Sequence, residues 1–565
     1  MIPMPTGALT ALRGALRQTR QAISTPRLTL SATALLMSVA IYVSLALNDP
    51  LWSLVLRELP SGAPWMAAGL MTSLGLILLA GTYTLLATLT PVRVLKPVVL
   101  LLLLVAALCH YFMRRYGAVI DTQMLVNVVE THPAEVRELL SPVLLTELAV
   151  YVGVPALMLS SIDLKPTTLW HGTRNRLLCG LALWGLALAV TALQYKDVSL
   201  WLRTHAELRE YPNPVVPVVS AVRLLTDQAQ RGQPSLTPIA EDARPRASVP
   251  SARRRVVVVI VGETARADHF GINGYPRDTT PRLSARSDVV TFSDMQSCGT
   301  STAISVPCMF ARDDRRHFDR REARRTENVL DVLQRVGVGV QWRENNAGCQ
   351  GVCTRIPTLR FDAGTHPQAC VDGECHDEVL LSDLRAQLQQ GRGDQLVVLH
   401  QLGSHGPAYF RRYPARHRYF TPECHLDDAY RCDTASLINS YDNTIRYTDH
   451  LIDRTIGLLS ELQADADVGL LYVSDHGESL GERGMYLHGF PYALAPASQT
   501  QIPLVAWISP GLQHALSIRR GCLREVAKQP HTHDDIFSTL LRLFGVQTES
   551  YQSRRDLFSD CERTV

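Results

Sequence analysis

The sequence lacks an excess of charge of either sign. Its 56 Lys and Arg residues nearly balance 53 Asp and Glu residues, so the formal net charge is only +3 over 565 residues. Nucleic-acid-binding domains need a basic surface, and this balance argues against that class. Beyond Gln228 the chain also lacks the long apolar stretches that dominate its first two hundred residues. Because a chain of this length forms at least two domains, we expect a membrane region followed by a soluble one.

The apolar first part contains five stretches that are long enough, or nearly so, to cross a bilayer as helices, which takes about 20 residues. No small-residue cleavage pattern follows the first stretch, so we interpret it as a retained span and not as a signal peptide. Arg and Lys residues precede the first and fifth stretches and lie between the second and third. This pattern predicts a cytoplasmic amino terminus and an exported soluble domain. The predicted spans are residues 28–48, 65–90, 95–112, 142–161 and 177–193.

The predicted division is a transmembrane domain over residues 1–195, a linker over 196–255 and a soluble domain over 256–565. In the linker, Pro212, Pro214 and Pro217 are expected to interrupt any helix before a short amphipathic one at residues 220–230. Residues 232–255 are rich in Pro, Ser, Ala and Arg. That composition buries too little apolar surface to fold alone and predicts a flexible tether.

Cysteine spacing supports an oxidising compartment for the soluble domain. Of the 12 cysteines, Cys109 and Cys179 fall in predicted spans, and the other ten lie in the soluble domain, most of them as close pairs. An even number at short spacings is typical of disulfides. Cys349 and Cys353 could instead bind a metal, but no second close Cys or His pair completes a zinc-finger spacing. The predicted bridges join Cys298 to Cys308, Cys349 to Cys353, Cys370 to Cys375, Cys424 to Cys432 and Cys522 to Cys561.

Two apolar runs end in side chains that bind metals. Residues 256–261 lead to Glu263, and residues 470–473 lead to Asp475 and His476. Both runs are β-branched without polar alternation, which is typical of parallel strands buried on both faces. Since parallel strands end at one edge of the sheet, these three side chains could converge there. Such a set suits zinc or manganese, although a capped strand end with a buried salt bridge is the alternative.

A loop between Cys298 and Cys308 offers several hydroxyl groups. Thr300, Ser301, Thr302 and Ser305 lie within it, and any of them could be a nucleophile. A hydroxyl is a weak nucleophile at neutral pH unless a base or a metal promotes loss of its proton. Ser/Thr-rich loops also form turns and helix caps, so this loop points to chemistry only together with the metal-binding side chains.

Taken together, these motifs resemble the membrane-bound phosphoethanolamine transferases that modify lipopolysaccharide, including the lipid A and mobile colistin-resistance types. These enzymes belong to the alkaline phosphatase superfamily. The resemblance spans nearly the whole chain. It is carried by residues 262–269, 273–275, 298–308, 400–410, 436–443, 474–482 and 487–489.

The resemblance implies a five-helix transmembrane domain followed by an alkaline-phosphatase-like α/β sandwich, a sulfatase-like catalytic domain with a mostly parallel sheet. It implies Zn²⁺, one ion or two, held by Glu263, Thr302, Asp475 and His476, with Thr302 also the nucleophile. His405 and His488 would line the donor and acceptor side and handle protons, whereas His400 is expected only to form hydrogen bonds. Asn127, Thr131 and Glu135 match a substrate-binding segment after the third span, although they could equally be the solvent-facing side of an amphipathic helix.

The implied reaction moves phosphoethanolamine from phosphatidylethanolamine to lipid A through a phosphothreonine intermediate. Added amines would reduce the negative charge of lipid A, which predicts polymyxin resistance. The enzyme would be a multi-pass protein of the bacterial inner membrane with a periplasmic catalytic domain. We expect a monomer whose partners are the donor and acceptor lipids.

One departure concerns the Lys that family members often carry between the paired cysteines, where this chain has Gln350. Arg343 or Arg355 could replace the lost charge, and Asn345 and Asn346 could contribute hydrogen bonds.

Three other functions remain as alternatives. A sulfatase needs a Cys-x-Pro-x-Arg pattern, and the sequence from Cys308 to Arg312 lacks the proline. A phosphoglycerol transferase or phosphodiesterase of the same superfamily fits the motifs less well. A metal- or lipid-binding sensor without catalysis would tolerate Thr302→Ala. The acceptor could also be a core sugar or a periplasmic glucan.

Overall fold

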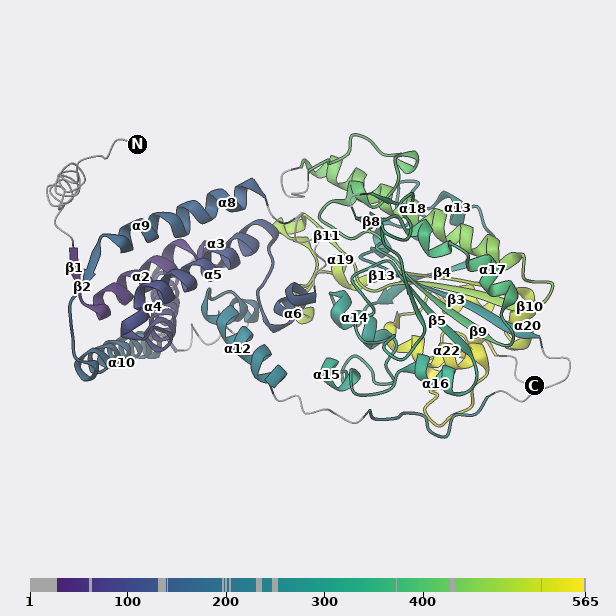
Figure 1. Cartoon of the computed structure of the whole chain (residues 1–565), viewed down its shortest axis with the longest axis horizontal. Coiled ribbons are helices and arrows are strands. Elements are labelled where there is room, and N and C mark those ends of the chain that lie inside the picture. The colour runs from purple at the N-terminus through teal and green to yellow at the C-terminus, as the bar shows by residue number, and fades with distance from the viewer. Residues whose placement is uncertain are drawn as a thin grey trace, which may run out of the picture. The chain divides into compact units, whose positions relative to one another are not determined.

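The computed structural model describes residues 28–59, 64–130, 139, 141–195, 198, 201–202, 205–229, 236–245, 253–371, 373–426, 432–519 and 521–562. The chain divides into two units, one of residues 1–111 and 142–218, the other of residues 112–141 and 219–565. Residues 112–141 lie between predicted spans in sequence, yet they belong to the same unit as the soluble domain. Figure 1 shows the helical region and the sheet domain.

The first unit contains apolar helices long enough to cross a membrane. Within the described residues there are four such helices, or five spans if the bent pair α2 and α3 counts as one. Many of their leucines, including Leu177, Leu181 and Leu188, are exposed, as expected of side chains that face lipid. This is the helical membrane region predicted from the sequence. The candidate spans are α4 (Pro64–Leu89), α5 (Leu95–Tyr116), residues Pro142–Ser160 and α10 (Leu169–Leu193), together with the pair α2 (Ala32–Ala46) and α3 (Asp49–Arg57), bent by 50°.

The second unit is built on a mostly parallel sheet. Among the described residues its strand order is β14-β4-β13-β10-β3-β9-β5-β6. Strands β10, β3, β9, β5 and β6 run parallel, and β13 is antiparallel to both β10 and β4. The strands are β3 (Arg254–Gly262), β4 (Val289–Gln296), β5 (Gly339–Glu344), β6 (Thr358–Arg360), β9 (Gln395–His400), β10 (Ala466–Ser474), β13 (Gln501–Ile508) and β14 (His531–Thr532).

Both faces of the sheet are covered by helices. Val257, Val259 and Val261 point into one apolar core, and the intervening residues of β3 point into the other, which explains why this strand is apolar without alternation. Figure 1 shows α13, α17 and α18 over one face and α14, α16 and α22 over the other. These helices are α13 (Pro281–Ser284), α14 (Thr302–Met309), α16 (Val329–Arg335), α17 (Leu384–Gln390), α18 (Thr434–Ser460) and α22 (Ile536–Phe544).

The register of the parallel strands brings their carboxyl ends to one edge. Ser474 pairs with Gly262, Val261 with His400, and Glu344 with His400. The residues that follow β3, β9 and β10 therefore lie side by side, and the site forms there.

The expected helix of the linker is present, but the described part of the linker differs from expectation in two ways. Helix α12 (Val215–Ala229) contains Pro217, because a proline in the first turn of a helix removes no intrahelical hydrogen bond. The predicted tether is partly ordered: Ile239 is buried in the core of the second unit. Its backbone N–H donates to Glu327 and its carbonyl accepts from Arg335. This segment cannot fold alone, but it packs against a domain that is already folded.

Candidate active site

The sheet edge brings the four predicted metal ligands together. Glu263, Asp475 and His476 are fully buried. The Nε2 of His476 lies 3.3 Å from Glu263 Oε1 and 3.3 Å from Asp475 Oδ2. Thr302 is the first residue of α14, and its Oγ1 donates to Glu263 Oε2 at 3.0 Å and lies 3.4 Å from His476 Nε2.

This arrangement fits a divalent metal ion. Ligands at about 2.0 to 2.1 Å from a tetrahedral zinc lie about 3.3 Å apart, close to the separations found here. Asp475 Oδ2 is buried and accepts no hydrogen bond from any described residue. Burial and the neighbouring Glu263 raise the pKa of Asp475 to about 7, and burial raises the pKa of Glu263. Two carboxylates held this close in the interior favour a bound cation.

Asn346 and Gly403 hold Glu263 in place. Asn346 Nδ2 donates to Glu263 Oε2 at 2.7 Å and to the carbonyl of Gln401 at 2.8 Å. Asn346 therefore has the expected hydrogen-bonding role, and one of its partners is the predicted metal ligand Glu263. The loop after β9 passes directly beside Glu263: a Cβ on Gly403 would lie 2.8 Å from the carbonyl oxygen of Glu263. Gly403 has a φ of 55°, so glycine is required there for two reasons.

Residues around Asn346 complete this support. His400 is buried with Nδ1 3.0 Å from Glu344 Oε1, which agrees with a hydrogen-bonding role. Asn345 Nδ2 donates to Asp377 at 2.8 Å.

The arginines considered as replacements for the missing lysine are engaged elsewhere. Arg355 forms a two-point ion pair with Asp331, with distances of 2.8 and 2.6 Å. Arg343 is buried and donates to Gln387 and to the carbonyl of Ser382. Neither side chain replaces a charge at Gln350, so that expectation is wrong.

Two histidines face the metal-ligand cluster. The ring of His488 lies 4.4 Å from that of His476 and 5.3 Å from that of His405, measured between centroids. Burial holds the pKa of His405 well below its usual value. The fully buried Glu478 contacts His488 Nδ1 at 2.8 Å and accepts from Tyr409 at 2.6 Å. A carboxylate on Nδ1 fixes the tautomer that leaves the Nε2 lone pair available. Glu478 had no predicted role, although it lies in the same motif as Asp475.

The Cys298–Cys308 loop presents Thr302 to the cluster. Thr300 donates to the carbonyl of Phe490 at 2.6 Å, and Ser305 accepts from Gly299 N–H at 3.1 Å. Thr302 contacts both Glu263 and His476.

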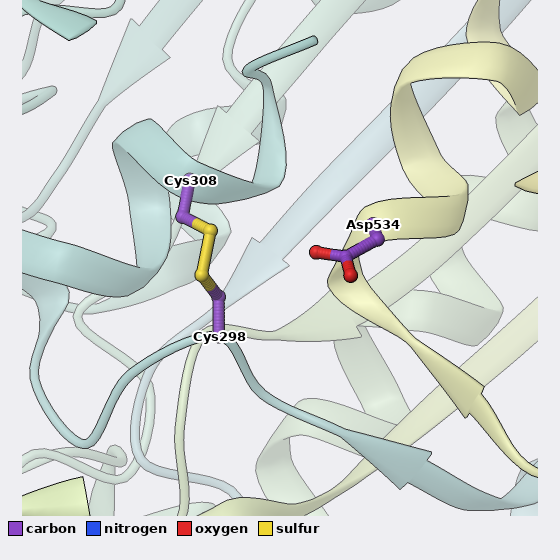
Figure 2. Close-up of side chains that lie close together, drawn as sticks. All are labelled: Cys298, Cys308 and Asp534. Atoms are coloured by element: carbon purple, nitrogen blue, oxygen red, sulfur yellow. A yellow bond between two sulfur atoms is a disulfide. The ribbon is translucent and has the colours of Figure 1, made fainter. Parts of the chain in front are cut away.

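The disulfide that closes this loop removes two alternatives. Asp534 lies close to Cys298 and Cys308 (Figure 2). These three residues could bind a metal only if both cysteines were free thiolates. The two sulfurs are bonded to each other, and therefore Cys308 cannot act as a sulfatase nucleophile either. The other four predicted bridges are also present.

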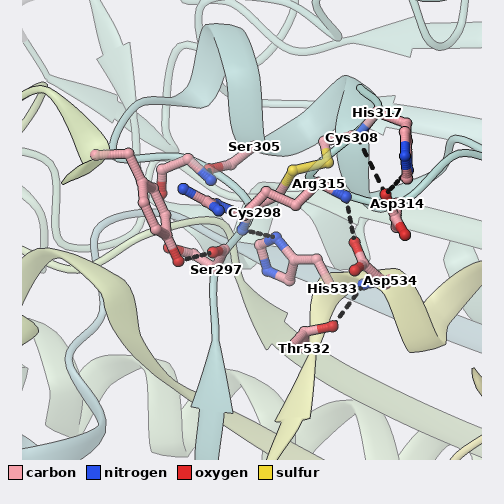
Figure 3. Close-up of a disulfide and its surroundings, with 12 residues drawn as sticks. Ser297, Cys298, Ser305, Cys308, Asp314, Arg315, His317, Thr532, His533 and Asp534 are labelled. Carbon is pink, nitrogen blue, oxygen red and sulfur yellow. Dashed lines mark hydrogen bonds and ion pairs between the residues drawn. A yellow bond between two sulfur atoms is a disulfide. The ribbon is translucent and has the colours of Figure 1, made fainter. Parts of the chain in front are cut away.

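His533 was missed by the sequence analysis. It is fully buried, and its Nδ1 accepts from the backbone N–H of Cys298 at 3.0 Å (Figure 3). Its Nε2 donates to the carbonyl of Ser474 at 2.9 Å. Burial lowers its pKa to about 4, so the ring is neutral. Thr532 and Asp535 form a capping box at the start of η12 (His533–Asp535). That local motif does not reveal the distant contacts of His533.

Asn127 lies beside the loop of His488. It is on α6 (Thr122–Glu130), and a Cβ on Gly489 would lie 3.2 Å from Asn127 Nδ2. Thr131 and Glu135 fall outside the described residues.

Comparison with known proteins agrees with this geometry. The family described as "Phosphoethanolamine transferase EptA/EptB" matches residues 77–229, and the family described as "Sulfatase" matches residues 255–546. The chain is 40% identical to "Phosphoethanolamine transferase EptA" of Escherichia coli strain K12, over 95% of this chain and 98% of that protein. It is 36% identical to "Phosphatidylethanolamine transferase Mcr-1" of Escherichia coli, over 94% and 97%.

A solved structure extends the similarity to the fold. The integral membrane lipooligosaccharide phosphoethanolamine transferase A (EptA) of Neisseria meningitidis matches with a TM-score of 0.89 and 34% identity, over 95% of this chain and 100% of that one. The chain therefore belongs to the EptA family of membrane-bound phosphoethanolamine transferases.

Proposed function

We propose that this protein transfers phosphoethanolamine from phosphatidylethanolamine to lipid A, with Thr302 as the nucleophile. The observation that carries the proposal is the position of Thr302 Oγ1, 3.0 Å from Glu263 and 3.4 Å from His476 at the first turn of a helix. The EptA and Mcr-1 relatives are named for phosphoethanolamine or phosphatidylethanolamine transfer, which supports this chemistry for the chain.

In the first step, Thr302 Oγ forms a bond to the headgroup phosphorus, and the bond from phosphorus to the diacylglycerol oxygen breaks. The hydroxyl proton leaves Thr302, and a proton is delivered to diacylglycerol. In the second step, a lipid A phosphate oxygen attacks the phosphothreonine and restores the free threonine. Glu263, Thr302, Asp475 and His476 would hold one zinc ion. Zinc bound there would lower the pKa of the Thr302 hydroxyl and neutralise negative charge on the phosphoryl oxygens.

Of the two histidines, His488 is better suited than His405 to carry the protons. The contact between Glu478 and His488 Nδ1 directs Nε2 of His488 toward the ligand cluster, where it can protonate the leaving oxygen or deprotonate the acceptor. The low pKa of His405 keeps it neutral near pH 7 and makes it a weak base, so it is better suited to bind a second ion. Asn127, next to Gly489, would contact the substrate headgroup.

The membrane region would hold the enzyme where both lipids are found. Five spans, with the bent pair α2 and α3 as the first, would place the catalytic unit in the periplasm at the inner membrane. Anchoring there raises the chance that donor and acceptor headgroups meet the site. We propose that the enzyme acts as a monomer. The amines that it adds to lipid A would reduce the negative charge of lipid A and so confer polymyxin resistance.

The test is mass spectrometry of lipid A from cells that express the intact chain, Thr302→Ala or Thr300→Ala. We expect a phosphoethanolamine increment with the intact chain and with Thr300→Ala, because the Thr300 hydroxyl binds the carbonyl of Phe490. Thr302→Ala should give none. An increment on core oligosaccharide alone would make the acceptor assignment wrong, and an increment that survives Thr302→Ala would make the nucleophile wrong.

A further inference from the structure

A second set of metal-binding side chains lies in the catalytic unit, and its residues have no part in the reaction above. Glu378 belongs to η6 (Asp377–Leu381), His417 ends η8 (Ala415–His417), and His450 lies on α18. One ligand atom from each lies within 4.8 Å of the others. Three separate elements thus meet at one point.

The group is partly buried: His450 is buried, whereas Glu378 and His417 are partly exposed. His450 Nε2 lies 3.0 Å from Glu378 Oε1, and the centroids of the His417 and His450 rings are 4.6 Å apart. The ring of Tyr447 lies 4.8 Å from that of His417. His450 is 8% exposed, and its Nδ1 is buried without a hydrogen-bond partner among the described residues. A buried imidazole nitrogen without a partner is costly in a site that holds no ligand.

The protonation states suit a cation. Burial, and then the neighbouring His450, lower the pKa of His417 to about 4. The hydrogen bond from His450 lowers the pKa of Glu378 to about 2. Near pH 7 the group therefore presents a carboxylate and a neutral imidazole, both of which can bind a metal without losing a proton.

Two arginines compete for the same carboxylate. Arg416 pairs with Glu378 Oε2, and Arg454 Nη1 lies 3.9 Å from Oε1. Their side chains are 63% and 56% exposed, and ion pairs this exposed contribute little free energy. Arg416 contacts Oε2, whereas His450 contacts Oε1, so Oε1 is the oxygen on the side of the histidine.

We propose that Glu378, His417 and His450 form a second divalent-metal site, separate from the ligands around Thr302. Two imidazoles and one carboxylate form a ligand set that zinc prefers, with a fourth position for water.

Such a site would brace the active-site loop. Asp377, next to Glu378, accepts hydrogen bonds from the backbone N–H groups of Leu402 and Gly403 at 2.8 and 2.9 Å. That loop leads to His405. A metal that ties Glu378 to α18 would therefore restrict the turn on which the loop rests.

The test uses the full chain in detergent, dialysed to equilibrium against zinc and then analysed for bound metal. We expect His417→Ala to hold one equivalent less zinc per protein than the intact chain. His317→Ala is the matched control, since His317 is a 77% exposed histidine that contacts Asp314, and it should hold as much as the intact chain. Equal zinc content in His417→Ala and the intact chain would overturn the proposal.

A second measurement covers the case in which His417→Ala misfolds. Crystals of the intact chain grown with zinc should show an anomalous peak at the zinc edge among the three side chains. Absence of that peak, with a peak present at Glu263, Asp475 and His476, contradicts the second site while leaving the first one intact.

Discussion

Buried Glu478 and partly exposed His488 form a pair in which Glu478 Oε2 lies 2.8 Å from His488 Nδ1. The pair fixes the imidazole that faces the ligand cluster. We predict that Glu478→Gln lowers kcat by about 10- to 100-fold, the effect typical of losing a carboxylate partner of a functional histidine, with a smaller change in KM. Steady-state kinetics on a fluorescent phosphatidylethanolamine would show this. Glu461→Gln, at an exposed ion pair with Arg385, is the control, and equal loss in both variants would contradict a specific role.

His533 connects the nucleophile loop to the end of β10. His533→Ala leaves the Cys298 N–H and the Ser474 carbonyl without their partner, and each unsatisfied buried group costs about 1 to 3 kcal/mol. We expect a lower free energy of unfolding together with reduced kcat. His533→Asn should recover part of the activity, because its side-chain oxygen can accept from Cys298. If alanine and asparagine variants of equal stability have equal kcat, His533 has no positioning role.

Zinc affinity should depend on pH through Asp475 and Glu263. Their pKa values are raised in the metal-free site, that of Asp475 to about 7, so both carboxylates tend to be protonated as the pH falls. Metal must displace those protons. We predict that affinity falls as the pH drops below about 7 and that binding at pH 6 releases protons. Burial lowers the pKa of His476, so this ligand holds a proton less tightly than an ordinary histidine. Calorimetry in buffers of different ionisation enthalpy measures the release, and a buffer-independent enthalpy at pH 6 would rule it out.

Gly489 allows α6 to lie close to the His488 loop. It has a φ of 88°, and a Cβ there would lie 2.9 Å from Met124 Cε. Gly489→Ala should reduce transfer activity more than Gly521→Ala. Gly521 has a φ of 81° but no atom within 4 Å of the added Cβ, so both variants carry the same kind of backbone strain and only one disturbs α6. Similar activities in the two variants would show that α6 has no part in the site.

Motifs that follow buried strands were predictable from the sequence. Glu263, Asp475 and His476 could be placed together because parallel strands share a carboxyl edge, and the close cysteine pairs indicated their own bridges. Contacts made by lone residues far apart in sequence were not predictable. His533 reaches residues 298 and 474 only because β14 pairs with β4, and nothing in its neighbours indicates that pairing.

Composition did not predict order in a segment that folds only against an already folded domain. Residues 236–245 look like a tether, yet Ile239 is buried in the domain core. Arg343 and Arg355 are near Gln350 in sequence, but their partners Ser382 and Asp331 turn them away from it. The direction of a side chain depends on partners that local sequence does not reveal.

The central claim is that Thr302 becomes covalently modified during transfer. The most direct measurement is peptide mass spectrometry of the intact enzyme after brief incubation with phosphatidylethanolamine and no acceptor. We predict a phosphoethanolamine adduct on Thr302 that disappears when lipid A is added. An active enzyme whose Thr302 never carries the adduct, or one that carries it on another residue, would contradict the account.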